Sequence, residues 1–178
     1  MLALKPKNIL YIEDDVVVAR LIQMKLEKLN FKVDIAQTAI DGLKKYFNSN
    51  YDVVLVDYEL PHFNGLQVMQ KLASNGSLPP LIMVTGAGNE AVAVEAMKLG
   101  AGDYVVKDAS SGFLNLLPTL IKHVWNQYRL KIEKQMAIEA LRESEKNLND
   151  FFDNAVELIQ QVSPSGNFMY VNNTWCKK

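Results

Sequence analysis

Residues 52–57 read Asp-Val-Val-Leu-Val-Asp, a short apolar run with an acidic residue at its end. Such a run is too apolar for a strand with one face in water, and it is typical of a parallel sheet that is covered on both faces. Similar short runs alternate with amphipathic stretches along the first two-thirds of the chain. We predict strands at residues 8–12, 31–36, 52–56, 81–84 and 103–106, and helices at 16–29, 38–48, 65–73 and 89–99. This alternation predicts an α/β fold with a doubly wound five-stranded parallel sheet.

The composition of the 178 residues is that of an ordinary globular protein, with 49% hydrophobic and 22% charged residues. A net charge of -1 gives no general attraction to nucleic acid or to an anionic membrane. No apolar run approaches the roughly 20 residues that span a bilayer, and no signal peptide is evident. The single cysteine, Cys176, cannot form an internal disulfide. We therefore expect a cytoplasmic protein and no nucleic-acid or membrane partner for this chain.

Polar residues follow the predicted strands, where doubly wound sheets bind their ligands. Glu13 and Asp14 follow the first strand, Asp57 the third, Thr85 the fourth and Lys107 the fifth. The next residue after the first pair, Asp15, is the expected N-cap of the following helix.

Crowded carboxylates at one rim repel each other, and a divalent cation would relieve that repulsion. Mg²⁺ prefers such oxygen ligands. An aspartate can act as a nucleophile toward phosphorus and form an acyl phosphate, and the transferring phosphoryl oxygens need cationic and hydrogen-bonding partners. Mg²⁺, the Lys107 ammonium and the Thr85 hydroxyl would supply them.

Four motifs in this order resemble the receiver domain of response regulators. They are Ile9–Asp15 (ILYIEDD), Val53–Pro61 (VVLVDYELP), Val84–Ala87 (VTGA) and Gly100–Lys107 (GAGDYVVK). The resemblance covers residues 8 to about 128 and implies a flavodoxin-like sheet with strand order 2-1-3-4-5.

The resemblance also implies a role for each site residue. Asp57 would be the phosphoacceptor, served by a sensor histidine kinase or a phosphotransfer protein, with Thr85 and Lys107 as its catalytic partners. Thr85 and Tyr104 would be the switch residues. Mg²⁺ would be held by Asp57, by Asp14 directly, by Glu13 largely through water, and by the backbone carbonyl of Glu59. The protein would be no enzyme beyond catalysing its own phosphorylation and dephosphorylation, and Glu59 and Ala87 would tune the lifetime of the phosphoryl group.

One residue departs from the family pattern, because Asp108 follows Lys107 where the family usually has a proline after a cis peptide bond. Without proline a cis bond costs about 3–4 kcal/mol. Both isomers stay open at this point, and the choice bears on the reach of Lys107.

The C-terminal third predicts a long helix over residues 119–149, with Pro118 in its first turn. Apolar residues suggest two weak coiled-coil seams, Leu117, Ile121, Val124 and Tyr128, then Ile138, Leu141, Leu148 and Phe152. We expect a homodimer through this helix.

The segments Glu139–Glu145, Phe151–Ala155 and Ser163–Asn172 resemble the linker and opening of a PAS sensor domain. The expected organisation is a receiver domain at 1–128, a helical linker at 129–149 and the truncated start of a PAS domain at 150–178.

Three other functions compete with the receiver hypothesis. A phosphatase of the haloacid-dehalogenase type also uses an aspartyl phosphate, but its Asp-x-Asp motif lies after one strand, whereas Asp57 is followed by Tyr58 and Glu59. A flavin or nucleotide module would need Gly, Ser or Thr after the first strand to bind phosphate. A degenerate receiver that serves only dimer contacts would not need the intact set of site residues.

Overall fold

The structure is a computed structural model that describes residues 5–74, 76, 78–86, 90–108 and 112–176. Ala87 and Asn89, which entered the predictions above, lie outside the described residues. The chain divides into two compact units, Met1–Leu130 and Lys131–Lys178. Among the described helices, none combines the length and the apolar character that a membrane span requires.

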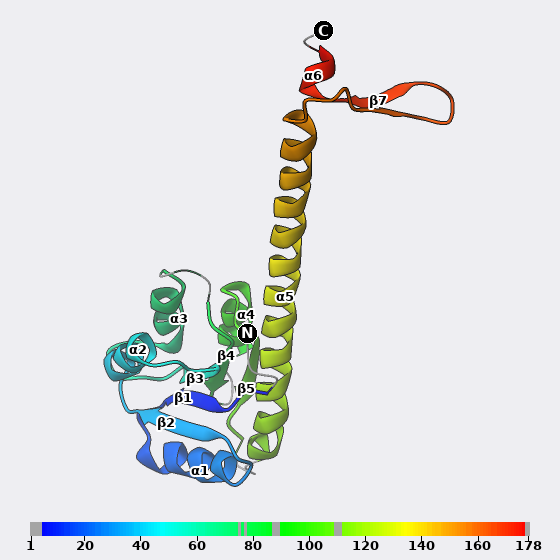
Figure 1. Cartoon of the computed structure of the whole chain (residues 1–178). Helices are drawn as coiled ribbons and strands as arrows, with labels where there is room; N and C mark the ends of the chain where they lie inside the picture. The colour runs from blue at the N-terminus through cyan, green and yellow to red at the C-terminus, as the bar shows by residue number, and fades with distance from the viewer. Residues whose placement is uncertain (1–4, 75, 77, 87–89, 109–111, 177–178) are drawn as a thin grey trace. The chain divides into compact units, whose positions relative to one another are not determined.

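A five-stranded parallel sheet forms the centre of the first unit (Figure 1). The strands are β1 (Asn8–Ile12), β2 (Lys32–Ala36), β3 (Val53–Asp57), β4 (Leu81–Thr85) and β5 (Asp103–Val106). Their order is β2-β1-β3-β4-β5, and every neighbouring pair is parallel. The predicted fold class and strand order are therefore confirmed.

The helices of the first unit are α1 (Val16–Glu27), α2 (Ala39–Asn48), α3 (Gly65–Ala73), α4 (Glu90–Lys98) and the start of α5 (Phe113–Asp153). Side chains before three of them accept hydrogen bonds from the exposed amides of the first turn, as N-caps do. These caps are Asp15 for α1, Thr38 for α2 and Asn64 for α3. The predicted caps at Asp15 and Thr38 are confirmed.

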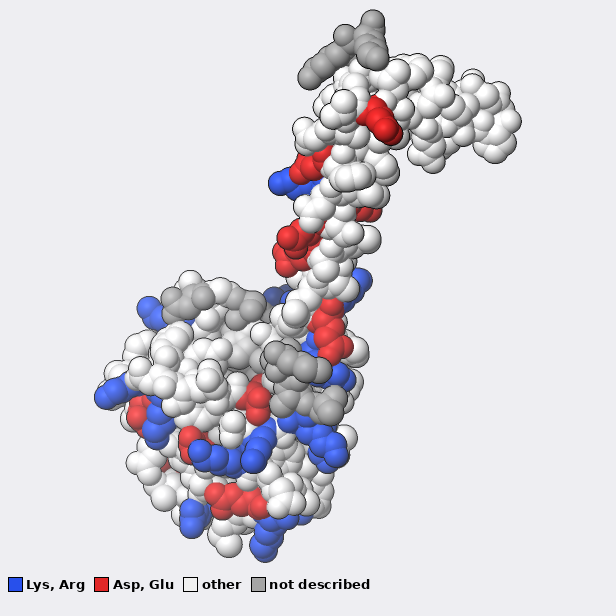
Figure 2. Space-filling model, in the orientation of Figure 1, with Lys and Arg blue, Asp and Glu red and all other residues white. Residues whose placement is uncertain are grey.

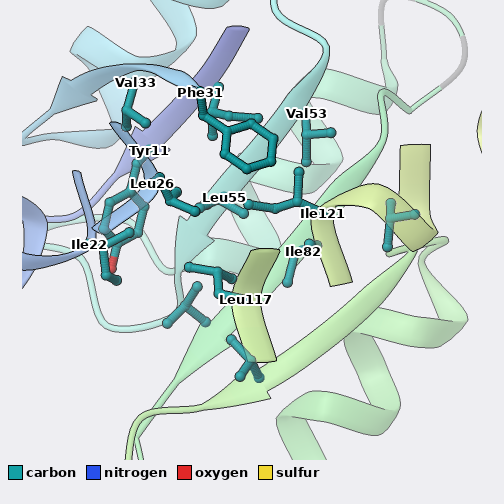
Figure 3. Packing of buried hydrophobic residues seen from close by; sticks show 14 of the residues in the cluster. Tyr11, Ile22, Leu26, Phe31, Val33, Val53, Leu55, Ile82, Leu117 and Ile121 are labelled. Carbon is teal, nitrogen blue, oxygen red and sulfur yellow. The ribbon is translucent and has the colours of Figure 1, made fainter. Parts of the chain in front are cut away.

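Two apolar layers cover the sheet, because successive side chains of a strand point to opposite faces. Ile9 and Tyr11 of β1 pack with residues of α1 and α5. Leu10 and Ile12 of the same strand pack with residues of α2, α3 and α4. Figure 3 shows part of the first layer. Burial on both faces explains why the strands are apolar throughout.

Helix α5 differs from its prediction in two respects. It begins at Phe113, so Pro118 lies inside the helix and not in its first turn. Leu117, Ile121 and Val124 are buried in the core layer against the sheet. The first predicted coiled-coil seam is therefore wrong, because a face that packs on its own domain has the same three- and four-residue spacing as a dimer seam.

The second unit contains the continuation of α5 and a two-stranded antiparallel sheet of β6 (Gln160–Val162) and β7 (Phe168–Val171), followed by α6 (Asn173–Cys176). Asn172 is its buried polar residue. The Asn172 amide donates to the carbonyls of Phe152 and Glu157 at 3.0 and 2.9 Å. It thereby ties the end of α5 to the segment before the hairpin.

Candidate functional site

The acidic residues meet where the central strands end. Ile12 of β1 is in register with Val56 of β3, so Glu13 and Asp57 emerge side by side from neighbouring parallel strands. Both are buried, with Glu13 1% and Asp57 2% exposed, and Asp14 is exposed beside them. Carboxylate oxygens of these three residues lie within 4.8 Å of one another. The structure thus brings together the acids that the sequence pattern singled out.

An open cleft of about 580 Å³ lies over these carboxylates. It is lined by Glu13, Asp14, Asp15, Asp57, Tyr58, Glu59, Leu60, Asn64 and Lys107. On the visible face of the first unit, Figure 2 shows acidic and basic side chains interspersed. The lining of the cleft, by contrast, holds several carboxylates against one lysine.

Lys107 reaches this cluster from the end of β5. Its ammonium nitrogen lies 2.9 Å from Asp57 Oδ1 and 3.0 Å from Glu13 Oε2. Its backbone amide donates to the Thr85 carbonyl at 2.7 Å, which fixes the residue beside β4. Asp57 Oδ1 is fully enclosed and has no aligned hydrogen bond, so its contact with Lys107 is chiefly electrostatic.

The electrostatics of the site follow from burial of two like charges. Burial raises the pKa of the Asp57 carboxyl from its ordinary value of 3.8 to about 6, the Glu13 carboxylate adds to the shift, and Lys107 acts against it. For Lys107, burial works to lower the pKa, but the Asp57 and Glu13 carboxylates outweigh it and raise the pKa.

Two buried carboxylates and an exposed one, against a single ammonium group, leave an excess of negative charge. Hard oxygen donors so arranged fit a divalent cation such as Mg²⁺, which commonly takes one or two carboxylates and keeps several waters. The enclosed Asp57 oxygen without an aligned hydrogen bond is a second feature that suits such an ion.

A buried tyrosine also belongs to the site, and sequence reasoning missed it. The Tyr11 hydroxyl donates a hydrogen bond to Glu13 Oε2. Burial raises the pKa of Tyr11 well above its ordinary value, and the neighbouring Glu13 charge adds to the shift, so the hydroxyl stays protonated. The available signal was the two-residue spacing between Tyr11, near the end of β1, and Glu13, directly after it.

The loop after β3 returns close to the site. Glu59 and Asn64 form an antiparallel bridge, and the Gly65 amide donates to the Tyr58 carbonyl at 2.9 Å. A β-carbon on Gly65 would lie 2.5 Å from the Asp57 carbonyl oxygen, so only glycine fits there without a shift. Glu59 lines the cleft, and its carbonyl as a metal ligand stays a prediction.

Neither of the two predicted switch residues, Thr85 and Tyr104, is among the described residues that line the cleft. Thr85 is buried at the end of β4, and its hydroxyl faces the Gly86 carbonyl at 3.4 Å. Tyr104 is 41% exposed and lines a second cleft, of about 620 Å³, with Val94 and Met97 of α4. Their roles as switches stay predictions.

Asp108 has a structural role in this chain. The described residues contain no cis peptide bond, so the bond between Lys107 and Asp108 is trans. Asp108 Oδ1 accepts a hydrogen bond from the Phe113 amide at 3.2 Å, at the first residue of α5. Lys107 nevertheless reaches both carboxylates.

The fold is that of receiver domains in two-component signalling. The sequence profile of the response regulator receiver domain matches residues 9–116. This match covers more than half of the chain and runs from β1 into α5. The chain therefore belongs to the response regulator receiver domain family.

Individual relatives agree with this assignment. The chain is 36% identical over 100 residues to the response regulator ArlR of Staphylococcus saprophyticus, covering 56% of this chain and 45% of that protein. It is 33% identical over 103 residues to the transcriptional regulatory protein ResD of Bacillus subtilis, covering 58% of this chain and 42% of ResD. The chain thus spans less than half the length of these curated relatives.

Solved structures are similar over the first unit. A response regulator receiver domain protein from Clostridium thermocellum superposes with a TM-score of 0.64 at 26% identity, covering 70% of this chain and 98% of that one. A CheY-like receiver domain protein from Methanospirillum hungatei superposes with a TM-score of 0.61 at 28% identity and the same coverage.

Proposed function

We propose that this chain is a phosphoacceptor that receives a phosphoryl group on Asp57 from the phosphohistidine of a sensor histidine kinase or a phosphotransfer protein. One observation carries the proposal. Asp57 ends the central strand at the floor of an open cleft, with two further carboxylates within 4.8 Å and the Lys107 ammonium at 2.9 Å. Receiver domains interact with sensor histidine kinases, and the cleft is open to such a donor.

The transfer step balances with groups that this chain and its donor provide. A carboxylate oxygen of Asp57 attacks phosphorus, an O–P bond forms, and the N–P bond of the phosphohistidine breaks. The electron pair of that bond stays on the imidazole nitrogen of the donor. With a pKa of about 6, Asp57 is mainly ionised at neutral pH and so available as the nucleophile. Lys107, already beside Asp57, would neutralise a phosphoryl oxygen.

Mg²⁺ is the cofactor that we propose for this step. Glu13, Asp14, Asp57 and the Glu59 carbonyl would hold it, and Thr85 would approach the phosphoryl group from the end of β4. When bound, the ion would neutralise negative charge on the carboxylates and on the transferring phosphoryl oxygens. The close set of carboxylate oxygens supports this assignment.

Intact mass after incubation with acetyl phosphate and Mg²⁺ tests the proposal. We expect the wild type to gain one phosphoryl group, the gain to require Mg²⁺, and Asp57→Asn to abolish it. Asp41→Asn is the matched control, because Asp41 is an exposed aspartate of α2 whose partner is Lys45. A wild type that gains no mass, or an Asp57→Asn variant that still does, would contradict the proposal.

Phosphate release in the same mixture separates the receiver from a phosphatase. We propose that the chain catalyses only its own phosphorylation and dephosphorylation. Release should then saturate with phosphodonor at the rate at which the Asp57 phosphoryl group is lost. Rapid release from unrelated phosphate esters, abolished by Asp57→Asn, would favour the phosphatase of the haloacid-dehalogenase type instead.

For the second unit we propose the opening of a PAS domain, reached through a dimerising part of α5. Leu141 and Leu148 of α5 are exposed and seven residues apart, which is the repeat of a coiled-coil seam. Phe168 and Met169 on the hairpin are also exposed, as expected for strands that further structure would cover.

Sedimentation equilibrium tests the dimer. The wild type should sediment as a dimer, and the double variant Leu141→Lys with Leu148→Lys as a monomer, because lysine at both seam positions removes apolar contact and adds repulsion. Glu143→Lys changes an exposed residue of the same helix and should keep the dimer. A wild-type monomer at high concentration would contradict this part of the proposal.

A further inference from the structure

Tyr11 of β1 and Glu13, which directly follows the strand, form a buried pair. Tyr11 belongs to the core layer under α1 and α5, whereas Glu13 lines the cleft at the end of the strand. Tyr11 is fully buried, and Figure 3 shows its ring in the apolar cluster with Ile22 and Leu26 of α1. Packing therefore holds the ring, and with it the hydroxyl, in one place.

The Glu13 carboxylate has two donors on one oxygen. Oε2 accepts from the Tyr11 hydroxyl and lies 3.0 Å from the Lys107 ammonium. The other oxygen, Oε1, is 3.4 Å from the Asp15 amide, which is a long contact. The position of this carboxylate in the cleft thus depends chiefly on Tyr11 and Lys107.

These two donors differ in whether they also contact another carboxylate. Lys107 is shared, because its ammonium also contacts Asp57 Oδ1 at 2.9 Å. A phosphoryl group on Asp57 would compete for the same ammonium with additional negative oxygens. Within the part of the chain that the structure describes, the Tyr11 hydroxyl donates to the Glu13 carboxylate, and Tyr11 is not among the residues that line the cleft. It is the donor that would stay with Glu13 throughout a phosphorylation cycle.

A hydrogen bond that fixes the carboxylate matters more for a glutamate at this position than it would for an aspartate. Its side chain has one more rotatable bond than aspartate, so an unheld carboxylate would lose more conformational freedom on binding an ion. Groups that hydrogen-bond a metal-binding carboxylate orient it, and their removal typically costs about 10- to 100-fold in metal affinity. A fixed phenol beneath Glu13 meets that description.

We propose that Tyr11 is a positioning residue of the cation site, and that its hydroxyl holds the Glu13 carboxylate toward Asp14 and Asp57 for Mg²⁺. The inference rests on the proposed function, since it takes Mg²⁺ as the ion of this cleft. It assigns to a residue of the apolar core a part in metal affinity, and it leaves the chemistry at Asp57 as described above.

Isothermal titration calorimetry with Mg²⁺ on the full chain tests the inference in a variant that lacks only the Tyr11 hydroxyl. Tyr11→Phe keeps the ring and deletes the hydroxyl, and we expect it to weaken Mg²⁺ binding about 10- to 100-fold. Tyr51→Phe is the matched control. The Tyr51 hydroxyl also donates to a carboxylate, Asp34 Oδ2 at 2.9 Å, but neither residue lines the cleft. Tyr51→Phe should bind Mg²⁺ as the wild type does.

A second comparison, made in a Glu13→Asp variant, shows whether the loss of Mg²⁺ affinity on removal of the Tyr11 hydroxyl depends on Glu13. Glu13→Asp shortens the side chain and withdraws the carboxylate from the phenol. In that background, adding Tyr11→Phe should change the Mg²⁺ affinity by less than about twofold. Urea unfolding in EDTA supplies a readout without metal, and the same pair of substitutions should there shift the unfolding midpoint by less than the sum of the single effects.

The outcomes separate this inference from the proposed function. If the wild type and Tyr11→Phe bind Mg²⁺ with the same affinity, the inference is wrong and the proposed function still stands. An equal loss of affinity on Tyr11→Phe in both backgrounds also overturns the inference, because the hydroxyl would then act on the fold and not through Glu13. Wild type that binds no Mg²⁺ overturns the cation site itself, and this inference with it.

Discussion

Replacing Asp57 with asparagine should stabilise the protein at high pH when no divalent cation is present. Asp57 is 2% exposed, and burial together with the Glu13 charge raises its pKa from 3.8 to about 6. Because the folded-state pKa is raised, the folded protein binds this proton more tightly than the unfolded chain does. The resulting stability is fully present below pH 3.8 and is lost as the pH rises through about 6.

The size of the effect follows from the shift in pKa. A shift of about two units at about 1.4 kcal/mol each corresponds to about 3 kcal/mol lost by the wild type above pH 7. Asparagine has nearly the shape of the protonated aspartate and never ionises, so the variant avoids this loss. We expect Asp57→Asn to exceed the wild type by about 1–3 kcal/mol at pH 8 and by about half as much at pH 5, where the carboxyl is ionised in the unfolded chain and still mostly protonated in the folded protein.

Urea unfolding followed by circular dichroism in EDTA at pH 5 and pH 8 measures this difference. With a slope of about 1–3 kcal/mol per molar urea, the midpoint at pH 8 should rise by about 1 M. Saturating Mg²⁺ should narrow or reverse the gap, because binding at about 100 times the Kd stabilises the wild type by about 2.7 kcal/mol. Asp41→Asn, an exposed aspartate, should show no such pH dependence.

An Asp57→Asn variant less stable than the wild type at pH 8 in EDTA would refute this reasoning. So would a difference in stability that is the same at pH 5 and pH 8. Either result would mean that the ionised Asp57 is better compensated by Lys107 than the distances suggest.

Three further substitutions test the packing and charges around the site, each by urea unfolding. Lys107→Gln should destabilise the protein by about 2 kcal/mol at pH 8, because two buried carboxylates lose their cation, and by much less at pH 5. An equal loss of stability at the two pH values would contradict the ion pairs. Gly65→Ala should lower the free energy of unfolding by about 1–3 kcal/mol, because its β-carbon would meet the Asp57 carbonyl. Gly86→Ala, where the β-carbon would have open space, should lower it far less, and a similar loss for both variants would contradict the close approach at Gly65. Thr38→Ala should cost about 1 kcal/mol through loss of the α2 cap, and an unchanged midpoint would speak against that cap.

The sequence predicted the sheet and the acids of the site because both depend on local patterns. A run such as Val53–Val56 is apolar at every position, which a sheet covered on both faces requires, and the polar residues after parallel strands necessarily share a rim. The long-range contacts were less accessible. That Lys107 reaches Glu13 as well as Asp57 depends on side-chain geometry across three strands.

The errors have equally physical causes. Tyr11 was taken as an ordinary strand residue, because an apolar ring and a donor hydroxyl cannot be told apart in a pattern of hydrophobicity. The start of α5 was placed too late, since Pro118 was assumed to lie in the first turn. Strand β6 was missed because Gln160-Gln161-Val162 has no apolar alternation, and its partner β7 lies across a turn.

The aspartate after Lys107 places a hydrogen-bond acceptor where the family usually has a proline ring. A proline would shape the backbone there by a covalent ring, which no change of conditions releases. Asp108 instead holds the first amide of α5 with a hydrogen bond of 3.2 Å, for which water can compete. Lys107, which pairs with Asp57 in the cleft, is thus the direct neighbour of Asp108. The Asp108 side chain accepts a hydrogen bond from the first amide of the 41-residue helix α5. The start of that helix is thus held by a hydrogen bond to one carboxylate, where a proline ring could not supply an acceptor.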